Sequence, residues 1–341
     1  MEIEITNTIQ AVEEDQWNAL VEPGFVEQSY RWYKTIEESG MIKMNYIFAK
    51  EKGRLTAAAC CFSYRHRLRS IPLEIPTLQV RTPLGTSRAF YSPTPEHTHM
   101  LREGLKEIME REKVKRVAVL GFREKEFDTA KDTLNGFIPL PPFADTYIDL
   151  DFADFDDYLS SLDASARRSI RKTLNRSEKR WKIKPLVTTE FSAWKRAART
   201  LQGYICQERN DYRMYLTEQF YEALERNLKD TAELMLLFKD EKPLVFGLSV
   251  NSPTISQHKA VGVDPRYREY QAYFLLYYEG IKRALERRQK RIYFGLTTYS
   301  FKEKIGCKRE HLYWLAKLDN PLFDLALKSY VALYRLSGAK E

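Results

Sequence analysis

The chain of 341 residues is 43% hydrophobic, 13% aromatic and 30% charged, the composition of a globular protein with enough apolar material for a core. This length accommodates two domains or one large domain. With 14 glycines and 14 prolines, the chain is neither collagen-like nor dominated by linkers. The net charge of +8 suits an anionic partner, such as a phosphate-bearing cofactor, a nucleic acid or a membrane surface, without choosing among them.

Three features bear on the cell compartment. The N-terminal sequence MEIEITNTIQ carries acidic residues and lacks the apolar core of a secretion signal. No apolar run approaches the roughly 20 residues that a membrane-spanning helix needs. The four cysteines are too few for a disulfide framework in a chain of this length. We therefore expect a cytoplasmic protein without an integral membrane segment.

The first half of the chain predicts a hairpin, a helix and a strand, in that order. Residues 46–55 run into TAAACCFSY and read as strand, tight turn and strand, with Gly53 at the turn. Residues 103–116 form a basic amphipathic helix, and the apolar strand VAVLG follows. A short helical piece then ends at the glycine of LNGF, residues 134–137.

The second half repeats this order. Residues 235–244 run into VFGLSV as a second hairpin, residues 279–291 form a second basic helix, and the strand IYFG follows. A short helical piece again ends in glycine, at residues 304–307. Four matched elements in the same order indicate two copies of one α/β unit. Further helices are expected across residues 155–181 and 191–228.

The boundary between the copies is expected at the sequence PLPP, residues 139–142. Proline fixes φ and donates no backbone hydrogen bond, so this cluster should interrupt any regular element. We therefore expect halves at residues 1–142 and 143–341, with a strand at TYIDLDF just beyond the boundary.

Several catalytic signatures are absent. The chain has no G-x-x-x-x-G-K-[ST] loop, no G-x-G-x-x-G after a strand, no H-E-x-x-H and no G-x-S-x-G. His97 and His99 form an H-x-H pair, but no third ligand is evident, and we expect a polar loop there and no metal site. Phosphoryl transfer, zinc hydrolysis and classical serine hydrolysis are disfavoured.

The segment QHKAVGVDPRYREYQAYFLL, residues 257–276, has a different character. It predicts a short strand, a turn with arginines and a helix start, which would aim free backbone N–H groups at an anion. The order strand, V-x-P-x-Y-R, helix, short strand, helix and glycine resembles the core of the GNAT acyltransferases. In that family the turn binds the pyrophosphate of coenzyme A.

The resemblance is closer to a branch with two tandem GNAT-like halves, which contains the FemAB-like peptidoglycan aminoacyltransferases and the CelD-like acyltransferases. Residues 17–32 look like its opening helices, residues 158–171 like its central basic helix, and residues 297–306 like its closing motif, in which an aromatic-lysine pair precedes a glycine. The resemblance implies an α/β (α+β) fold of two tandem GNAT-like units, each a mixed, partly antiparallel sheet flanked by helices. It places the acceptor site in the degenerate first half and donor binding and chemistry in the second.

The resemblance also implies roles for particular residues. Lys302 would stabilise an oxyanion or bind a substrate phosphate, His258 would be a base facing the acceptor amine, and Tyr299 would protonate the leaving group in place of Phe301. The residues expected to bind the donor come from the strand, the turn and the closing motif: Val261, Gly262, Val263, Arg266, Arg268 and Phe301.

Two donors remain open. Coenzyme A enzymes of the GNAT type have a glycine-rich turn, whereas residues 266–273 contain no glycine, and Glu269 would repel a pyrophosphate. Residues 167–184 hold nine Lys or Arg and one acid, and form either a nucleic-acid footprint with Arg168, Lys172 and Lys179 as tRNA contacts, or a solvated helix balanced by nearby acids. Aminoacyl-tRNA and acyl-CoA are therefore both candidate donors.

The sequence thus predicts an N-acyltransferase with no tightly bound cofactor. It would transfer an acyl or aminoacyl group to an amine of a small molecule, a peptide or a cell-envelope precursor. The alternative is a catalytically inactive GNAT-fold module that binds RNA or a protein partner.

Overall fold

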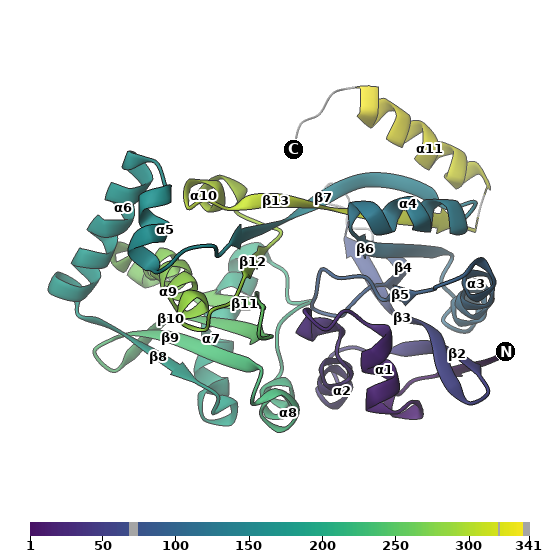
Figure 1. Ribbon diagram of the computed structural model, residues 1–341, viewed down its shortest axis with the longest axis horizontal. Helices are drawn as coiled ribbons and strands as arrows, with labels where there is room; N and C mark the ends of the chain where they lie inside the picture. Colours follow the sequence, from purple (N-terminus) through teal and green to yellow (C-terminus); the bar gives the residue numbers. More distant parts are fainter. Residues whose placement is uncertain (68–73, 320, 337–341) are drawn as a thin grey trace.

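The computed structural model describes residues 1–67, 74–319 and 321–336, which form one mixed sheet flanked by helices (Figure 1). The first half of the chain contributes five strands to one end of the sheet: β1 (Glu2–Thr6), β2 (Asn45–Glu51), β3 (Arg54–Arg67), β4 (Glu74–Val80) and β6 (Arg116–Phe122). The second half contributes five to the other end: β12 (Arg291–Gly295), β11 (Ile255–Val263), β10 (Lys242–Asn251), β9 (Ala232–Lys239) and β8 (Ile183–Thr188). The two-residue strand β5 (Phe90–Tyr91) pairs with β3.

The two remaining strands are exchanged between the halves. β7 (Ile138–Asp149) follows the first half's helix α4 (Glu124–Thr133) but pairs antiparallel with β12. β13 (Lys308–Leu318), from the end of the second half, inserts between β6 and β7 and pairs antiparallel with both. Each half is therefore completed by a strand from the other, and Figure 1 shows β7 and β13 crossing between the halves.

The proline cluster lies inside β7 and does not interrupt it, so that expectation is wrong. Pro139 pairs with Leu315 of β13, and a register shift at Leu312/Trp314 leaves Pro141 and Pro142 outside the regular ladder. An irregularity of this kind tolerates proline because no ladder N–H is needed there. The carbonyl of Pro141 still accepts a 2.6 Å hydrogen bond from the Trp314 indole. The division of the chain at residue 142 stays a proposal.

The order of elements predicted for the repeat is confirmed, although both repeat helices begin and end earlier than expected. The hairpins are β2–β3 and β9–β10, and the helix–strand pairs are α3 (Pro95–Arg111) with β6 and α9 (Ala272–Glu286) with β12. In each half one strand pair is parallel over only three residues, β4 with β6 and β11 with β12. Beyond Gln257, β11 runs on to Val263 without further pairing to β12, so the two strands separate there.

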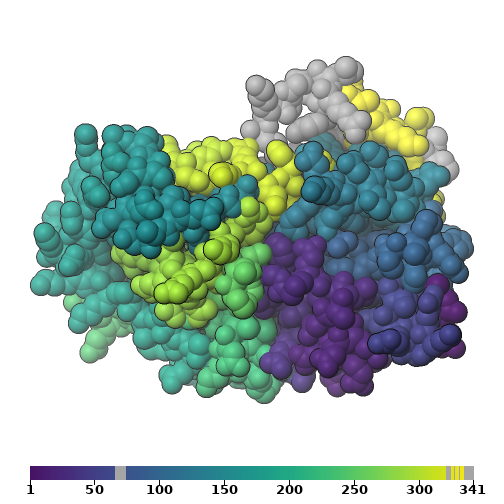
Figure 2. Space-filling view, in the orientation of Figure 1, coloured from purple at the N-terminus to yellow at the C-terminus, as the bar shows by residue number. Residues whose placement is uncertain are grey.

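Helices from both halves share one core. α1 (Glu14–Leu20) and α2 (Tyr30–Glu38) pack with α7 (Phe191–Arg209) and α8 (Glu218–Leu228) in a single apolar cluster. Ser29 caps the start of α2, since its hydroxyl accepts from the Trp32 N–H, and Trp32 meets Phe220 of α8 edge-on at 6.2 Å. Figure 2 shows this contact as the purple N-terminal region pressed against the green part of the second half.

The other faces of the sheet carry separate helices. α3 and α4 pack over the first half. α9, α5 (Phe155–Ser161) and α6 (Ala164–Asn175) pack over the second half. A π-helical segment, Arg176–Trp181, extends α6, and α10 (Tyr299–Lys304) joins β12 to β13. The last helix, α11 (Pro321–Leu336), packs on β7 and β13.

The close packing of α7 on β11 can be tested by a substitution at Gly262. A Cβ at this position would lie 2.5 Å from the carbonyl carbon of Leu201 in α7, which is closer than real Cβ contacts. We expect Gly262→Ala to lower the free energy of unfolding by about 1–3 kcal/mol, because the helix must shift. The measurement is urea unfolding followed by circular dichroism.

Gly203→Ala in the same helix is the matched control. A Cβ there would lie 3.6 Å from the Tyr215 hydroxyl, so no clash arises. This substitution should raise the free energy of unfolding by up to about 1 kcal/mol, because alanine loses less backbone entropy than glycine when the helix forms. Equal effects of the two substitutions would contradict the close packing at Gly262.

Candidate active site

Lys302 lies at the place where β11 and β12 separate. It is fully buried, and its ammonium donates to the carbonyl of Phe294 at 2.6 Å and to that of Gly295 at 2.9 Å. Both carbonyls end β12, and α10 brings the lysine back to them after a turn at Thr298 with φ of 63°. Burial lowers the pKa of Lys302 to about 8, although the nearby Asp145 carboxylate opposes this shift.

Asp145 on β7 supplies the negative charge beside Lys302. It is 3% exposed and accepts the Thr86 hydroxyl at 2.9 Å and the backbone N–H of Thr146 at 2.8 Å. Burial raises its pKa to about 6, while these hydrogen bonds and Lys302 act in the opposite direction. The Thr146 hydroxyl also donates to the Gly295 carbonyl that Lys302 uses. The acid and the lysine are thus held by one hydrogen-bonded frame.

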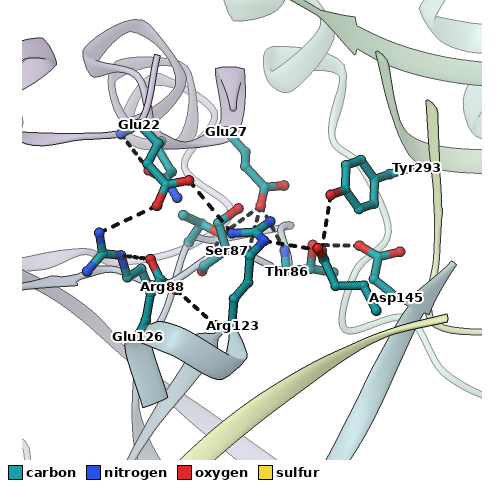
Figure 3. A network of polar contacts seen from close by, with 12 residues as sticks. Glu22, Glu27, Thr86, Ser87, Arg88, Arg123, Glu126, Asp145 and Tyr293 are labelled. Carbon is teal, nitrogen blue, oxygen red and sulfur yellow. Dashed lines mark hydrogen bonds and ion pairs between the residues drawn. The ribbon is translucent and has the colours of Figure 1, made fainter. Parts of the chain in front are cut away.

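A buried ion pair joins the two halves next to this frame. Glu27, from the first half, pairs with Lys259 of β11, and their side chains are 0% and 6% exposed. Glu27 also accepts the backbone N–H groups of Thr86 at 3.0 Å and Ser87 at 2.7 Å. Lys259 can reach it because β11 bulges between His258 and Ala260. The Thr86 loop therefore connects Glu27 to Asp145 (Figure 3).

Two arginines extend the network along the boundary between the halves. Arg123 bonds Glu310 of β13 at 3.1 Å and lies 4.2 Å over the ring of Phe25, and Tyr293 of β12 donates to the same carboxylate at 3.1 Å. Arg88 contacts Glu126 at 2.8 Å. Glu22 reaches both arginines, at 3.5 Å from Arg88 and 3.8 Å from Arg123, as Figure 3 shows.

An aromatic cluster lies on the α9 side of the separated strands. The hydroxyls of Tyr273 and Tyr277 are 2.9 Å apart, and Phe301 meets the ring of Tyr277 edge-on at 5.2 Å. Phe294 lies 4.9 Å from Tyr277 and 4.7 Å from His258. Burial raises the pKa of Tyr277, so its hydroxyl stays protonated and can donate a hydrogen bond.

Three of the sequence-predicted site residues, Lys302, Phe301 and His258, gather around this cluster. Burial and the neighbouring Lys302 cation lower the pKa of His258 to about 4, so the imidazole is neutral at ordinary pH. Tyr299 points elsewhere, because its hydroxyl donates to the Ala144 carbonyl at 2.8 Å and Arg309 lies 4.4 Å over its ring. The catalytic roles of these residues stay predictions.

The turn expected to bind an anion is filled by its own side chains. Arg266 contacts both carboxylate oxygens of Asp264, at 2.9 and 2.6 Å, and donates to the Tyr204 hydroxyl at 2.8 Å. Arg268 pairs with Glu208 at 3.2 Å. Val261 and Val263 pack into the core under α9, while Gly262 makes room for α7.

The predicted RNA-contact residues lie on the outer side of α6 and its π-helical extension. They line a shallow hollow together with further cations, and the full set is Arg167, Arg168, Arg171, Lys172, Arg176, Lys179 and Arg180. Trp181, at the end of this helix, meets Tyr270 of the turn at 5.8 Å, and Tyr270 stacks on Tyr267 at 6.2 Å. Lys242 lies 4.6 Å over the ring of Tyr267. Cations and aromatic rings thus form one surface from α6 to the turn.

Several residues of this site were not predicted from the sequence: Glu22, Glu27, Arg88, Arg123, Asp145, Lys259, Tyr293 and Glu310. They are single charged or polar residues with no motif around them. Glu27 and Lys259 are 232 positions apart, so only the fold brings them together. A faint signal was Asp145, an acid that directly follows the apolar residues Phe143 and Ala144 within a strand.

His97 and His99 lie in helix α3, so the expectation of a polar loop is wrong. The buried His97 ring bonds the hydroxyls of Thr94 at 2.7 Å and Thr56 at 2.9 Å, which explains it as a packing residue. Among residues 1–67, 74–319 and 321–336, no group of His, Cys, Asp and Glu could hold a metal ion. Within the same residues, no helix is both long and apolar enough to cross a membrane.

A profile of the FemAB-like family, described as peptidoglycan biosynthesis/recognition, matches residues 76–337. The chain belongs to this family. No match was found among curated proteins.

Solved structures with the same fold include FemX, with 14% identity, a TM-score of 0.61 and coverage of 96% of this chain and 100% of FemX. A tandem GNAT protein from the clavulanic acid biosynthesis pathway has 11% identity and a TM-score of 0.57, and the match covers 94% of this chain and 99% of that protein. A conserved protein of unknown function from Bacteroides thetaiotaomicron has 13% identity and a TM-score of 0.60, and the match covers 92% of this chain and 99% of that protein. The expected tandem GNAT-like fold is thereby confirmed, and family and fold together indicate an acyltransferase.

The Glu27–Lys259 pair provides a test of how the halves are held together. Lys259→Ala leaves a buried carboxylate without its cation, and we expect a loss of about 3–5 kcal/mol in the free energy of unfolding. Lys50→Ala, which breaks the more exposed pair with Glu4, should cost no more than about 1 kcal/mol. Chemical denaturation of both variants measures the difference, and equal losses would contradict a structural role for the buried pair.

Proposed function

We propose that this chain transfers an aminoacyl group from an aminoacyl-tRNA to an amine of a peptide or cell-envelope precursor. The observation that carries the choice of donor is the cationic and aromatic surface from α6 to the turn after β11. Seven cations line it, and the described ion pairs neutralise only Arg171, through Asp156 at 3.5 Å. Unpaired cations of this kind bind phosphates and release counterions.

The aromatic rings favour a nucleic acid that is single-stranded at its end. Trp181, Tyr270 and Tyr267 lie beside the cations, and bases stack on such rings with little dependence on sequence. The Thr173 hydroxyl donates to the Gln271 side chain at 2.8 Å, so α6 is fixed against the start of α9. We propose that the end of such a strand enters beside Lys302, where β11 and β12 separate.

The same turn argues against coenzyme A as the donor. A pyrophosphate needs free backbone N–H groups and close approach of the main chain. Here the Arg266 guanidinium is bound to Asp264, and tyrosines occupy the space that glycines leave open in coenzyme A enzymes.

Lys302 is proposed to stabilise the oxyanion that forms on the attacked ester carbonyl. Its ammonium donates to two fixed carbonyls, which leaves its third N–H for the oxyanion. A buried cation acts more strongly on a developing charge than one in water. As the amine forms the amide bond, the ester bond to the ribose breaks, and the ribose oxygen takes a proton.

Asp145 is proposed to accept the proton that the acceptor amine loses. It lies on the first-half side of Lys302 and its carboxylate is ionised above pH about 6. The acceptor would therefore enter from the boundary between the halves, and the donor from the α9 side. His258, neutral and packed between aromatic rings, would shape the donor side of the site.

The test is binding and turnover with bulk aminoacylated tRNA across a salt series. Arg168→Glu/Lys172→Glu/Lys179→Glu should weaken tRNA binding more than tenfold and reduce the salt slope, since several phosphate contacts are lost. Lys302→Ala should bind tRNA normally but transfer the aminoacyl group to amine-bearing muropeptides about 10²–10³-fold more slowly. Lys304→Ala, at an exposed neighbouring lysine, should behave as the wild-type chain.

The charge-matched control for binding is Lys52→Glu/Lys125→Glu/Lys131→Glu, at three scattered exposed lysines. If this control loses tRNA binding to the same extent, the α6 surface has no specific role. Tight acetyl-CoA binding without salt dependence would replace the donor by acyl-CoA. Binding of tRNA with no transfer to any amine, in wild type and variants alike, would leave an RNA-binding module.

The pH dependence follows from the two buried charges. Asp145 must be ionised to accept the proton of the amine, so kcat/KM should fall below pH about 6. Lys302 must be protonated to stabilise the oxyanion, so kcat/KM should fall above pH about 8. Asp145→Asn should remove the acidic limb and lower the plateau, while the alkaline limb remains. A profile of the wild type that is flat between pH 5 and 9 would contradict these assignments.

A further inference from the structure

A second cationic surface lies on the first half, away from the residues of the candidate active site. It is a groove of about 440 Å³ between the C-terminal part of α3, the start of β6 and the end of β13. Its floor is apolar and consists of Leu105, Met109, Val114, Val117, Phe137 and Leu318. The volume lies within the range of small-molecule pockets, roughly 300–1,000 Å³.

The rim of the groove is basic. Five cations surround the floor, Arg102, Lys106, Lys113, Lys115 and Lys317, against two acids, Glu110 and Asp319. Lys106 pairs with Glu103 at 2.6 Å, and Arg102 lies 5.8 Å over the ring of Phe137. Lys113, Lys115 and Lys317 form no ion pair with a described residue. Their charges are therefore available to an anion outside the chain.

The chain that leaves the groove carries exposed leucines. Leu318 and Asp319 line the groove, and α11 begins two residues later at Pro321. On α11, Leu327 and Val331 pack on the sheet, whereas Leu325 and Leu333 are 62% and 66% exposed. These are the two most exposed large apolar side chains among the described residues. α11 packs on Ala118 and Leu120, which alternate along β6 with Val117 and Val119 under α3, so the two helices cover opposite faces of the sheet. The exposed leucines therefore form an apolar surface separate from the groove.

We propose that this groove seats an anionic phospholipid, and that its basic rim docks the protein on an anionic membrane surface. The match is one of charge and polarity together: the lysines of the rim suit a phosphate, and the aliphatic floor suits acyl carbons. A free nucleotide or a nucleic acid fits less well. The floor holds one aromatic ring, already covered by Arg102, and no polar side chain that could read a base.

The experiment is sedimentation of the full chain with vesicles of phosphatidylglycerol and phosphatidylcholine, or of phosphatidylcholine alone. We expect binding to the anionic vesicles only. Lys113→Glu/Lys115→Glu/Lys317→Glu should reduce the partition coefficient at least tenfold, because the rim changes from net positive to net negative. The three positions lie outside the site proposed for catalysis, so transfer from aminoacyl-tRNA in solution should be unchanged.

The triple glutamate variant of α6, at Arg168, Lys172 and Lys179, is the matched control, since it changes the net charge of the chain by the same amount. It should keep vesicle binding and lose tRNA binding, the reverse of the groove variant. Equal loss of vesicle binding in both variants would overturn the proposal, because it would show attraction by net charge alone. Circular dichroism verifies that both variants fold.

A direct readout uses an environment-sensitive dye on a single introduced cysteine. The four native cysteines are buried, so Lys113→Cys can be labelled selectively. Its emission should shift to the blue with anionic vesicles, while the dye on Lys172→Cys should not respond. No shift at position 113, or the same shift at position 172, would refute docking through the groove.

Discussion

The fold and the candidate site both depend on the insertion of β13 between β6 and β7. Backbone hydrogen bonds to both neighbours close one sheet across the two halves, so neither half has a free edge at the boundary. The same strand brings Glu310 opposite Asp145 and follows directly on the helix that carries Lys302. The exchanged strands, together with α10 and the Thr86 loop, therefore hold the acid and the lysine close to each other.

Buried charge is the second constraint on the arrangement of the halves. Glu27 and Lys259 lose their hydration, and such a pair stabilises a protein only when hydrogen bonds satisfy its remaining groups. The two backbone N–H groups of Thr86 and Ser87 do this for Glu27. A shift of one half against the other would leave a buried charge unpaired, which is unfavourable. The pair therefore keeps the halves in this arrangement, with Thr86 next to Asp145 (Figure 3).

The proposed chemistry uses opposite sides of the separated strands. Lys302, whose ammonium bonds the carbonyls at the end of β12, lies beside Asp145 on β7, whose pKa is raised by burial. The proposed donor surface and the proposed lipid groove are both basic, yet different side chains surround their charges. Aromatic rings border the cations of α6, whereas aliphatic side chains lie beneath those of the groove. Surroundings, more than charge, decide which anion a basic surface suits.

The sequence by itself determined the repeated hairpin, helix and strand, because apolar periodicity and turn residues act over a few neighbouring positions. It also placed Phe301 and Lys302 in a closing motif, and the basic residues on α6. It did not determine the strand exchange, the continuation of β7 through its prolines or the use of Gly262 in packing. Those features arise from hydrogen bonds and contacts between residues more than a hundred positions apart or between different elements. For the same reason, Asp145, Glu27 and Lys259 became visible as a site only in the tertiary structure.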